Sequence, residues 1–238
     1  MYFHEQLYNM KNFNVPDPVT SHRDIAIPGI MTIRNYWISA SIVMLLAGIL
    51  SYFYLDIPVA LWFNGLKTTG FYRVFKLMTR MGESQWYLAA GLLSYLLLRK
   101  TKPAISSSGL LLFSSVALSG LAADLVKIVL GRARPKLYFS ETIFGFDPFH
   151  LEHAWISFPS GHSATAFSVA STLSILFPQY RIAFFLWAAL IAFSRVATTQ
   201  HYLSDVLAGS LLGAASTAFL YHRYFKTPSH ALIPSRIR

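Results

Sequence analysis

The sequence predicts an all-α integral membrane protein, a bundle of six transmembrane helices, and three observations lead to this fold class. Charged residues make up only 13% of the 238 residues, whereas a soluble domain carries roughly 25%. Hydrophobic residues make up 54% and aromatic residues 16%, more apolar material than one small soluble core needs. Six nearly uncharged runs also follow one another along the chain. Together these features exclude an ordinary soluble globule and a disordered chain.

The first run, residues 36–55, has the ~20 residues that a helix needs to cross a bilayer. It begins well after Met1, so it is expected to be an uncleaved anchor and not a signal peptide. The second run, 84–98, is short, but basic residues within 99–102 can extend the span because their long stems snorkel toward the headgroups. The other four predicted spans are 103–130, 162–180, 182–199 and 203–221.

A segment of a different kind, residues 61–80, lies between the first two runs. Aromatic residues such as Trp62 and Phe71 are mixed there with basic residues such as Lys67 and Arg73. Such a mixture is typical of helices that lie in the membrane interface, and one or two of them are expected here.

The distribution of Lys and Arg indicates how the chain crosses the membrane. With six crossings both termini lie on one side, and cytoplasmic termini place eleven of the 20 Lys and Arg residues inside. This excess favours cytoplasmic termini, and it grows if Lys127, Arg134 and Arg195 are set aside as functional. The expected organisation is a polar N-terminal tail (1–33), a single six-helix membrane domain (34–225) and a basic C-terminal tail (226–238).

Charge and cysteine content exclude several function classes. The formal net charge is +10, but Lys and Arg lie mostly between apolar runs and are not gathered on one polar domain, so no nucleic-acid partner is expected. The chain has no cysteine, which excludes disulfides, a thiolate nucleophile and a Cys-ligated metal.

Alternation of helix direction places three polar segments on one face of the membrane. The first runs from Lys127 to Pro135 and contains Arg134. A cation inside a membrane helix is costly and usually marks a partner or a pathway. The simpler alternative is that Lys127 pairs with Asp124, one turn earlier, and that Arg132 and Arg134 lie among the headgroups.

The second segment, Pro159-Ser160-Gly161-His162, opens an apolar helix. The free backbone N–H groups and the dipole of such an N-terminus favour an anion. A plain helix cap, with His162 resting at the interface, is the alternative.

The third segment contains Ser194, Arg195, His201 and Asp205. If His201 opens the last helix, Asp205 lies one turn further on the same face. Its carboxylate could then accept from one imidazole nitrogen and leave the other free as a nucleophile or base. A purely structural His–Asp bond is the alternative.

The three segments together fit a phosphate. Arg and Lys clamp oxygens, backbone N–H groups bind more of the charge, and two imidazoles can divide attack and protonation. A two-metal site fits poorly, because the nearest acidic residues lack the spacing of paired carboxylates.

At these residues the sequence resembles the type 2 phosphatidic acid phosphatases, a family that shares its site with vanadium haloperoxidases. The family pattern is Lys, six residues, Arg-Pro; then Pro-Ser-Gly-His; then Ser-Arg, five residues, His, three residues, Asp. The resemblance covers about residues 120 to 210. All defining positions are present: Lys127, Arg134, Pro135, Pro159, Ser160, Gly161, His162, Ser194, Arg195, His201 and Asp205.

The resemblance implies a role for each of these side chains. His201 would attack phosphorus and form a phosphohistidine, His162 would protonate the leaving oxygen and then activate water, and Asp205 would orient His201. The family uses no metal ion and no cofactor. The phosphate oxygens would be held by Lys127, Arg134, Ser160, Gly161 and Arg195.

The resemblance also implies a substrate class and a location. The substrate would be a phosphomonoester or diphosphate of a membrane lipid, such as phosphatidic acid, phosphatidylglycerophosphate, undecaprenyl diphosphate or the 1-phosphate of lipid A. The motifs do not choose among these lipids, and they leave the oligomeric state open. The protein would lie in the cell (inner) membrane with its active site on the outer, periplasmic side.

Two other function classes compete with this interpretation. A transporter or flippase could bind an anionic head group without cleaving it, but polar residues on one membrane face alone argue against a path through the protein. A catalytically silent lipid-binding protein is disfavoured by the pair His162 and His201.

Overall fold

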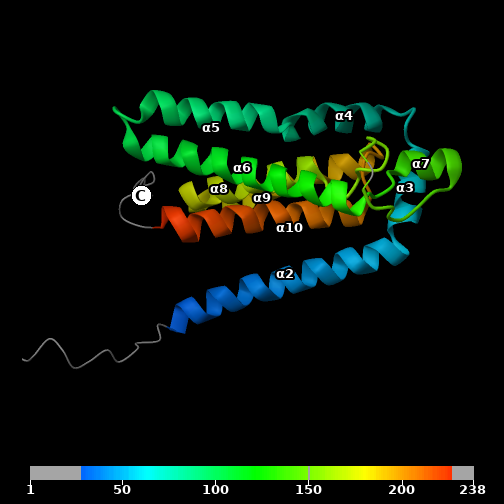
Figure 1. Ribbon diagram of the computed structural model, residues 1–238, viewed down its shortest axis with the longest axis horizontal. Helices are drawn as coiled ribbons and strands as arrows, with labels where there is room; N and C mark the ends of the chain where they lie inside the picture. Colours follow the sequence, from blue (N-terminus) through cyan, green and yellow to red (C-terminus); the bar gives the residue numbers. More distant parts are fainter. Residues whose placement is uncertain (1–27, 150, 227–238) are drawn as a thin grey trace, which may run out of the picture. The chain divides into compact units, whose positions relative to one another are not determined.

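The structure, a computed structural model, describes residues 28–149 and 151–226, which fall into two compact units, Met1–Ala40 and Ser41–Arg238. Most of the expected N-terminal tail and residues 227–238 of the expected C-terminal tail lie outside the described residues. The described chain is helical, without a named strand (Figure 1). Its long helices are α2 (Pro28–Tyr54), α5 (Ser84–Leu98), α6 (Pro103–Leu130), α8 (Gly161–Leu176), α9 (Arg181–Ala197) and α10 (Leu203–Leu220).

Short elements connect the long helices. The interfacial segment forms α3 (Asp56–Asn64), α4 (Gly70–Met78) and the 3₁₀ turn η1 (Thr79–Gly82). The short helix α7 (Pro135–Glu141) lies between α6 and α8, and the 3₁₀ turn η2 (Pro178–Tyr180) lies between α8 and α9. The π-helical turn η3 (Tyr221–Phe225) follows α10.

Each of the six predicted spans coincides with a long helix, but the count of six crossings is not confirmed. Among the described residues, three segments are long and apolar enough to cross a membrane, Pro103–Leu130, Pro178–Ala197 and Leu203–Phe225. The pair Ile38–Tyr54 and Asp56–Asn64, bent by 66°, makes a fourth if it is one span. Helices α5 and α8, with 15 and 16 residues, are shorter than a standard span. The first helix also starts at Pro28, earlier than the expected Tyr36, because proline is well tolerated in the first turn of a helix.

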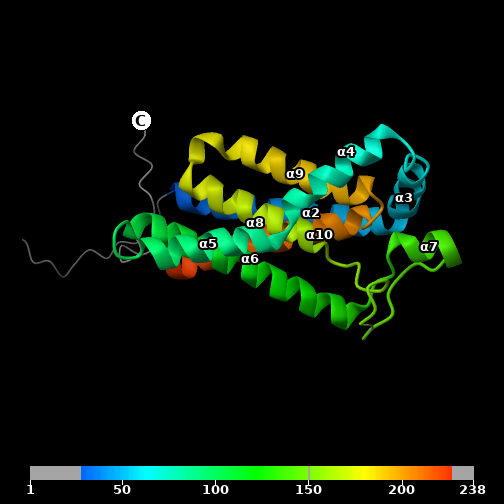
Figure 2. The same cartoon turned by 90° about the horizontal axis from the view of Figure 1, so that it is seen from above.

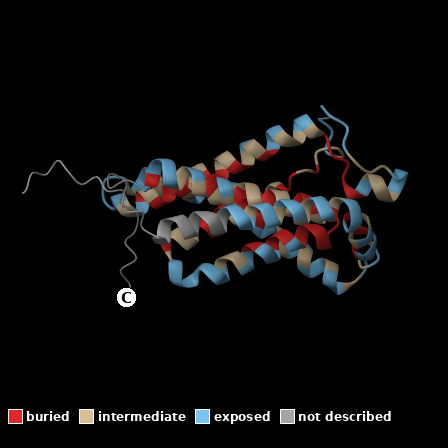
Figure 3. Ribbon diagram, turned by 90° about the horizontal axis from the view of Figure 1, so that it is seen from below, coloured by how far each residue is buried: buried red, intermediate tan, exposed pale blue. Residues whose placement is uncertain are grey.

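Helix α8 lies at the centre of the Ser41–Arg238 unit and packs against α6, α9 and α10 (Figures 1 and 2). The contact with α10 is close because two glycines of α10 face the α8 backbone. A Cβ added to Gly209 would lie 2.3 Å from the Ser160 carbonyl oxygen, and one added to Gly213 would lie 2.1 Å from that of Ala164. Small residues allow helices to approach in this way in membrane proteins. Buried residues gather where these helices face one another (Figure 3).

The end of α6 fixes the start of the next loop. Gly131 caps the helix in a left-handed conformation with φ +57°, and its N–H donates to the Lys127 carbonyl. A Cβ at Gly131 would lie 1.7 Å from the Asp147 carbonyl oxygen, so both the conformation and the space require glycine. This cap turns the chain so that the loop beginning with Arg132 enters the interior, where Arg132 is fully buried.

Candidate active site

The three polar segments meet at one end of the packed helices, beside α7 and α3 (Figures 1 and 2). The Ser160 N–H at the start of α8 donates to the Asp205 carbonyl of α10 at 3.0 Å. The Arg134 side chain, after α6, donates to the Gln200 carbonyl in the turn between α9 and α10 at 3.1 Å. Backbone acceptors thus join residues that lie far apart in the sequence.

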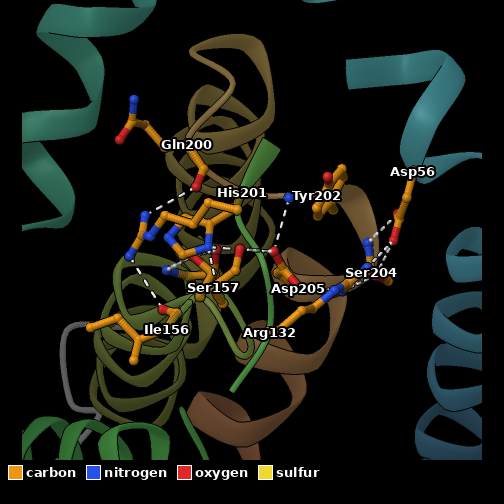
Figure 4. Close-up of polar contacts among 12 residues, drawn as sticks. Asp56, Arg132, Ile156, Ser157, Gln200, His201, Tyr202, Ser204 and Asp205 are labelled. Carbon is orange, nitrogen blue, oxygen red and sulfur yellow. Dashed lines mark hydrogen bonds and ion pairs between the residues drawn. The ribbon is translucent and has the colours of Figure 1, made fainter. Parts of the chain in front are cut away.

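His201 is buried in the turn before α10, and the Ser157 carbonyl fixes its imidazole (Figure 4). The distance from His201 Nδ1 to this oxygen is 2.8 Å. A carbonyl can only accept, so Nδ1 carries the proton and the lone pair of Nε2 is free. Burial lowers the pKa of His201 to about 3, and the nearby cations Arg134 and Arg195 act in the same direction. The imidazole is therefore neutral near pH 7, as a nucleophile must be.

Asp205 lies one turn along α10 from His201, on the same face as expected. Its Oδ2 is 3.6 Å from His201 Nδ1, longer than a hydrogen bond. The carboxylate instead accepts from Ser157 Oγ at 2.6 Å, from the Tyr202 N–H at 2.9 Å and from the Arg132 guanidinium. Asp205 is thus linked to His201 mainly through Ser157, whose hydroxyl donates to Asp205 and whose carbonyl accepts from the imidazole.

The Arg134 side chain joins the loop between α7 and α8 to the turn before α10. Its guanidinium donates to the carbonyls of His153 at 2.8 Å, Gln200 at 3.1 Å and Ile156 at 3.3 Å. Burial lowers the pKa of Arg134. Three of its five N–H groups are used in this way, which leaves two for a phosphate.

Arg195, near the end of α9, is 8% exposed and donates to Thr79 Oγ1 of η1 at 2.6 Å. Its Nε has no hydrogen-bond partner among the described residues. Because a buried N–H without a partner is costly, this group is available for an anionic ligand.

Lys127 has two neighbours. Its Nζ lies 2.7 Å from the carboxylate of Asp124, the pair that the simpler interpretation expected. The same Nζ lies 3.3 Å from the position that a Cβ on Gly161 would take. The ammonium group is therefore at the N-terminus of α8, where the predicted phosphate would bind, while it pairs with a carboxylate that is 67% exposed.

The start of α8 combines a cap, an open backbone and a histidine. Ser160 is the N-cap, and its hydroxyl accepts from the Ser163 N–H at 3.4 Å. Gly161 leaves room above the backbone, and His162 packs against Gly82 of η1, where an added Cβ would lie 3.1 Å from His162 Cδ2. This end of the helix has the free N–H groups and dipole that bind anions.

Four functional candidates were not predicted from the sequence: Asp56, Arg132, Ser157 and Ser204. The Arg132 guanidinium donates to Asp56 Oδ2 and to Ser204 Oγ, each at 2.6 Å, and also to Asp205 (Figure 4). Arg132 was expected to lie among the headgroups, as the simpler interpretation of its segment, but its side chain is fully buried. The only signal for Asp56 in the sequence was its position as an acidic residue at the end of an apolar run. That position does not indicate its partner.

Two cavities adjoin the site. One, of about 340 Å³, is called the polar cavity here because most of its lining residues are polar, although they present both polar and apolar surface. These residues are Arg134, Lys136, Glu152, His153, Ala154, Thr199 and Gln200. The Arg134 guanidinium lowers the pKa of His153 at its rim. The other, of about 230 Å³, is apolar and lies between α2 and α10, with lining residues that include Tyr52, Phe146, Phe158 and Leu211.

Among the described residues, no three His, Asp or Glu side chains come together as a metal site would require. Metal-independent chemistry stays a prediction.

Comparisons with known proteins place this geometry in a family context. The family model of the PAP2 superfamily matches residues 108–228. The lipid A 1-phosphatase of Rhizobium etli is 37% identical over 163 residues, covering 62% of this chain and 70% of that protein. The lipid phosphate phosphatase 1 of Arabidopsis thaliana is 28% identical over 147 residues, covering 50% of this chain and 45% of that protein.

A solved structure supports the fold. The transmembrane PAP2-type phosphatidylglycerolphosphate phosphatase from Bacillus subtilis superimposes with a TM-score of 0.51 at 19% identity, covering 76% of this chain and 94% of that one. The similarity extends beyond the motifs to most of the helices.

Proposed function

Because the chain belongs to the PAP2 superfamily, we propose that it is an integral-membrane lipid phosphatase that removes the 1-phosphate of a lipid A-type glycolipid. The single observation that carries the chemistry is the buried His201, whose Nδ1 donates to the Ser157 carbonyl and whose Nε2 is free. The choice of lipid is supported by the similarity to the Rhizobium etli lipid A 1-phosphatase.

In the first half of the proposed reaction, His201 Nε2 attacks phosphorus and the bond from phosphorus to the lipid oxygen breaks. His162 donates a proton to that oxygen, which leaves as the hydroxyl of the lipid. Lys127, Arg195 and the N-terminus of α8 stabilise the charge on the equatorial oxygens. Arg134 adds its two remaining N–H groups.

In the second half, His162 accepts a proton from a water molecule, which attacks the phosphohistidine. The bond from nitrogen to phosphorus breaks, inorganic phosphate leaves, and His201 is neutral again. Neither half requires a metal ion or a cofactor.

The polar cavity supports a sugar head group. Lys136 and Glu152 offer opposite charges, and Thr199 and Gln200 lie in the turn directly before the nucleophile. A phosphorylated sugar presents hydroxyl and amide groups that such a mixed lining can hydrogen-bond.

The proposed location is the inner membrane, with cytoplasmic termini and the active site on the periplasmic side. The distribution of Lys and Arg supports this orientation.

The test is phosphate release by purified protein in detergent with excess chelator. Lipid A, phosphatidic acid, phosphatidylglycerophosphate and undecaprenyl diphosphate are compared, and His201→Ala is the control. The expected result is release by the wild type alone, fastest from lipid A. A faster reaction with another lipid would overturn the substrate, and release by His201→Ala would overturn the mechanism.

A further inference from the structure

We propose that Asp56 and Arg132 are positioning residues for the nucleophile, acting through Asp205 and Ser157. Neither residue is a defining position of the three motifs, since Arg132 is one of the six unspecified residues between Lys127 and Arg134. Asp56 lies outside the segment matched by the family model. The inference rests on the proposed phosphatase function.

Asp56, Arg132, Ser157, Ser204 and Asp205 form one hydrogen-bonded network, called the positioning device. Its centre is the guanidinium of Arg132, which is fully buried between two fully buried carboxylates. One Nη donates to Asp56 Oδ2 of α3 at 2.6 Å, and the other donates to Asp205 Oδ1 of α10. The planar fork of arginine fixes both carboxylates in direction as well as in distance. The side chain thereby connects α3, the loop after α6 and α10.

Ser204 closes this arrangement. Its hydroxyl accepts from Arg132 at 2.6 Å and can donate to Asp56, and its backbone N–H donates to Asp56 Oδ1 at 3.0 Å. Ser51, near the end of α2, donates to the same Asp56 oxygen at 2.8 Å. Both oxygens of Asp56 are thus occupied, as a buried carboxylate requires.

The link to the nucleophile runs through Ser157. Its hydroxyl donates to Asp205 at 2.6 Å, and its N–H donates to the Arg132 carbonyl at 3.0 Å. Its own carbonyl accepts from His201 Nδ1 at 2.8 Å. Arg132 therefore holds Ser157 twice, by its main chain and through Asp205, and the held residue orients the imidazole.

Aromatic rings keep this device dry. The Arg132 guanidinium carbon lies between 4.8 and 5.9 Å from the ring centres of Tyr52, Phe144, Phe146, Phe158 and Tyr202. Cation–π contact stabilises the guanidinium, and exclusion of water strengthens its hydrogen bonds. A dry device in which both carboxylates and both Nη groups of Arg132 are paired has few alternative geometries, which suits the positioning of a nucleophile.

The experiment compares Asp56→Asn and Ser157→Ala with the matched control Glu141→Gln, an exposed carboxylate at the end of α7. Asp56→Asn keeps the shape of the side chain and removes its charge. Ser157→Ala removes only the hydroxyl and keeps the carbonyl that accepts from His201. This milder change provides the test if Asp56→Asn does not fold. Turnover is divided by the number of vanadate-binding sites, so that unfolded protein is not counted.

We expect Asp56→Asn to lower kcat per vanadate site by about 10- to 100-fold, because small misplacement of a reacting group costs this much. KM should change little, since the phosphate-binding groups remain. Glu141→Gln should match the wild type in both constants. Unchanged kcat per site in Asp56→Asn and Ser157→Ala would overturn the inference, because it would show a purely structural role.

A double-mutant cycle provides the second readout. If Asp56 acts through Ser157, the double variant should lose little more activity than the more impaired single variant. Multiplicative losses would overturn the proposed route. Failure of the wild type to release phosphate from any lipid would contradict the proposed function itself, so the two failures are distinguishable.

Discussion

At the residue scale, the protonation of His201 follows from one hydrogen bond and from burial. The Ser157 carbonyl holds the proton on Nδ1 at 2.8 Å, and burial lowers the pKa to about 3. The ordinary pKa of histidine is about 6.5, so the folded protein binds a second proton, on Nε2, less readily than the unfolded chain does. The contribution of neutral His201 to the free energy of folding is therefore complete above pH 6.5, and it is lost as the pH falls toward 3.

We therefore predict that His201 stays neutral, with its proton on Nδ1, from pH 8 down to pH 5. The measurement is a titration of ¹⁵N-labelled histidine by NMR in detergent, with His201→Ala to assign the signal. A midpoint near pH 6.5 for His201 would contradict the buried, hydrogen-bonded state.

At the element scale, the contact between α8 and α10 sets the position of the N-terminus of α8, where we propose that the phosphate binds. Gly209 faces Ser160, the N-cap of α8, and a Cβ there would lie 2.3 Å from the Ser160 carbonyl oxygen. Because a backbone atom cannot move aside like a flexible side chain, one added methyl group must separate the two helices.

We predict that Gly209→Ala lowers the free energy of unfolding by about 1–3 kcal/mol, the usual cost of overpacking, and also lowers activity. Gly120→Ala in α6 is the matched control, because nothing lies within 4 Å of its added Cβ. Unfolding in detergent followed by circular dichroism compares the two. Equal stability of the two variants would refute the close contact.

At the scale of the whole molecule, the proposed orientation puts the α5–α6 connection in the cytoplasm and α7 outside. The chain has no cysteine, so single cysteines can be labelled without background. We predict that a membrane-impermeant maleimide labels Glu141→Cys in intact spheroplasts, whereas Thr101→Cys reacts only after lysis. The reverse pattern would show that the termini are outside.

The sequence predicted the helices better than it predicted the interactions among them. Apolar runs are local signals, so each expected span coincides with a long helix. The motif residues could be identified because the motifs are defined by residue type and by spacing along the sequence. The pairing of Asp56 with Arg132 spans 76 positions, and no local pattern indicates it.

The acceptor for His201 could not be predicted for a different reason. Asp205 was the visible candidate, since a carboxylate four residues on lies on the same helix face. The hydrogen bond goes instead to the main chain of Ser157, and every residue type has a carbonyl. Sequence patterns of side chains cannot indicate such an acceptor.

The pairing around Arg132 has an electrostatic consequence for the phosphohistidine that we propose at His201. Two carboxylates share one guanidinium, so this buried group contains one more anion than cation, and Asp205 lies 3.6 Å from His201 Nδ1. When Nε2 bonds to phosphorus while Nδ1 keeps its proton, the ring becomes positively charged. The uncompensated negative charge behind it opposes the repulsion from Arg134 and Arg195, so the phosphorylated ring is stabilised on the side that faces away from the substrate.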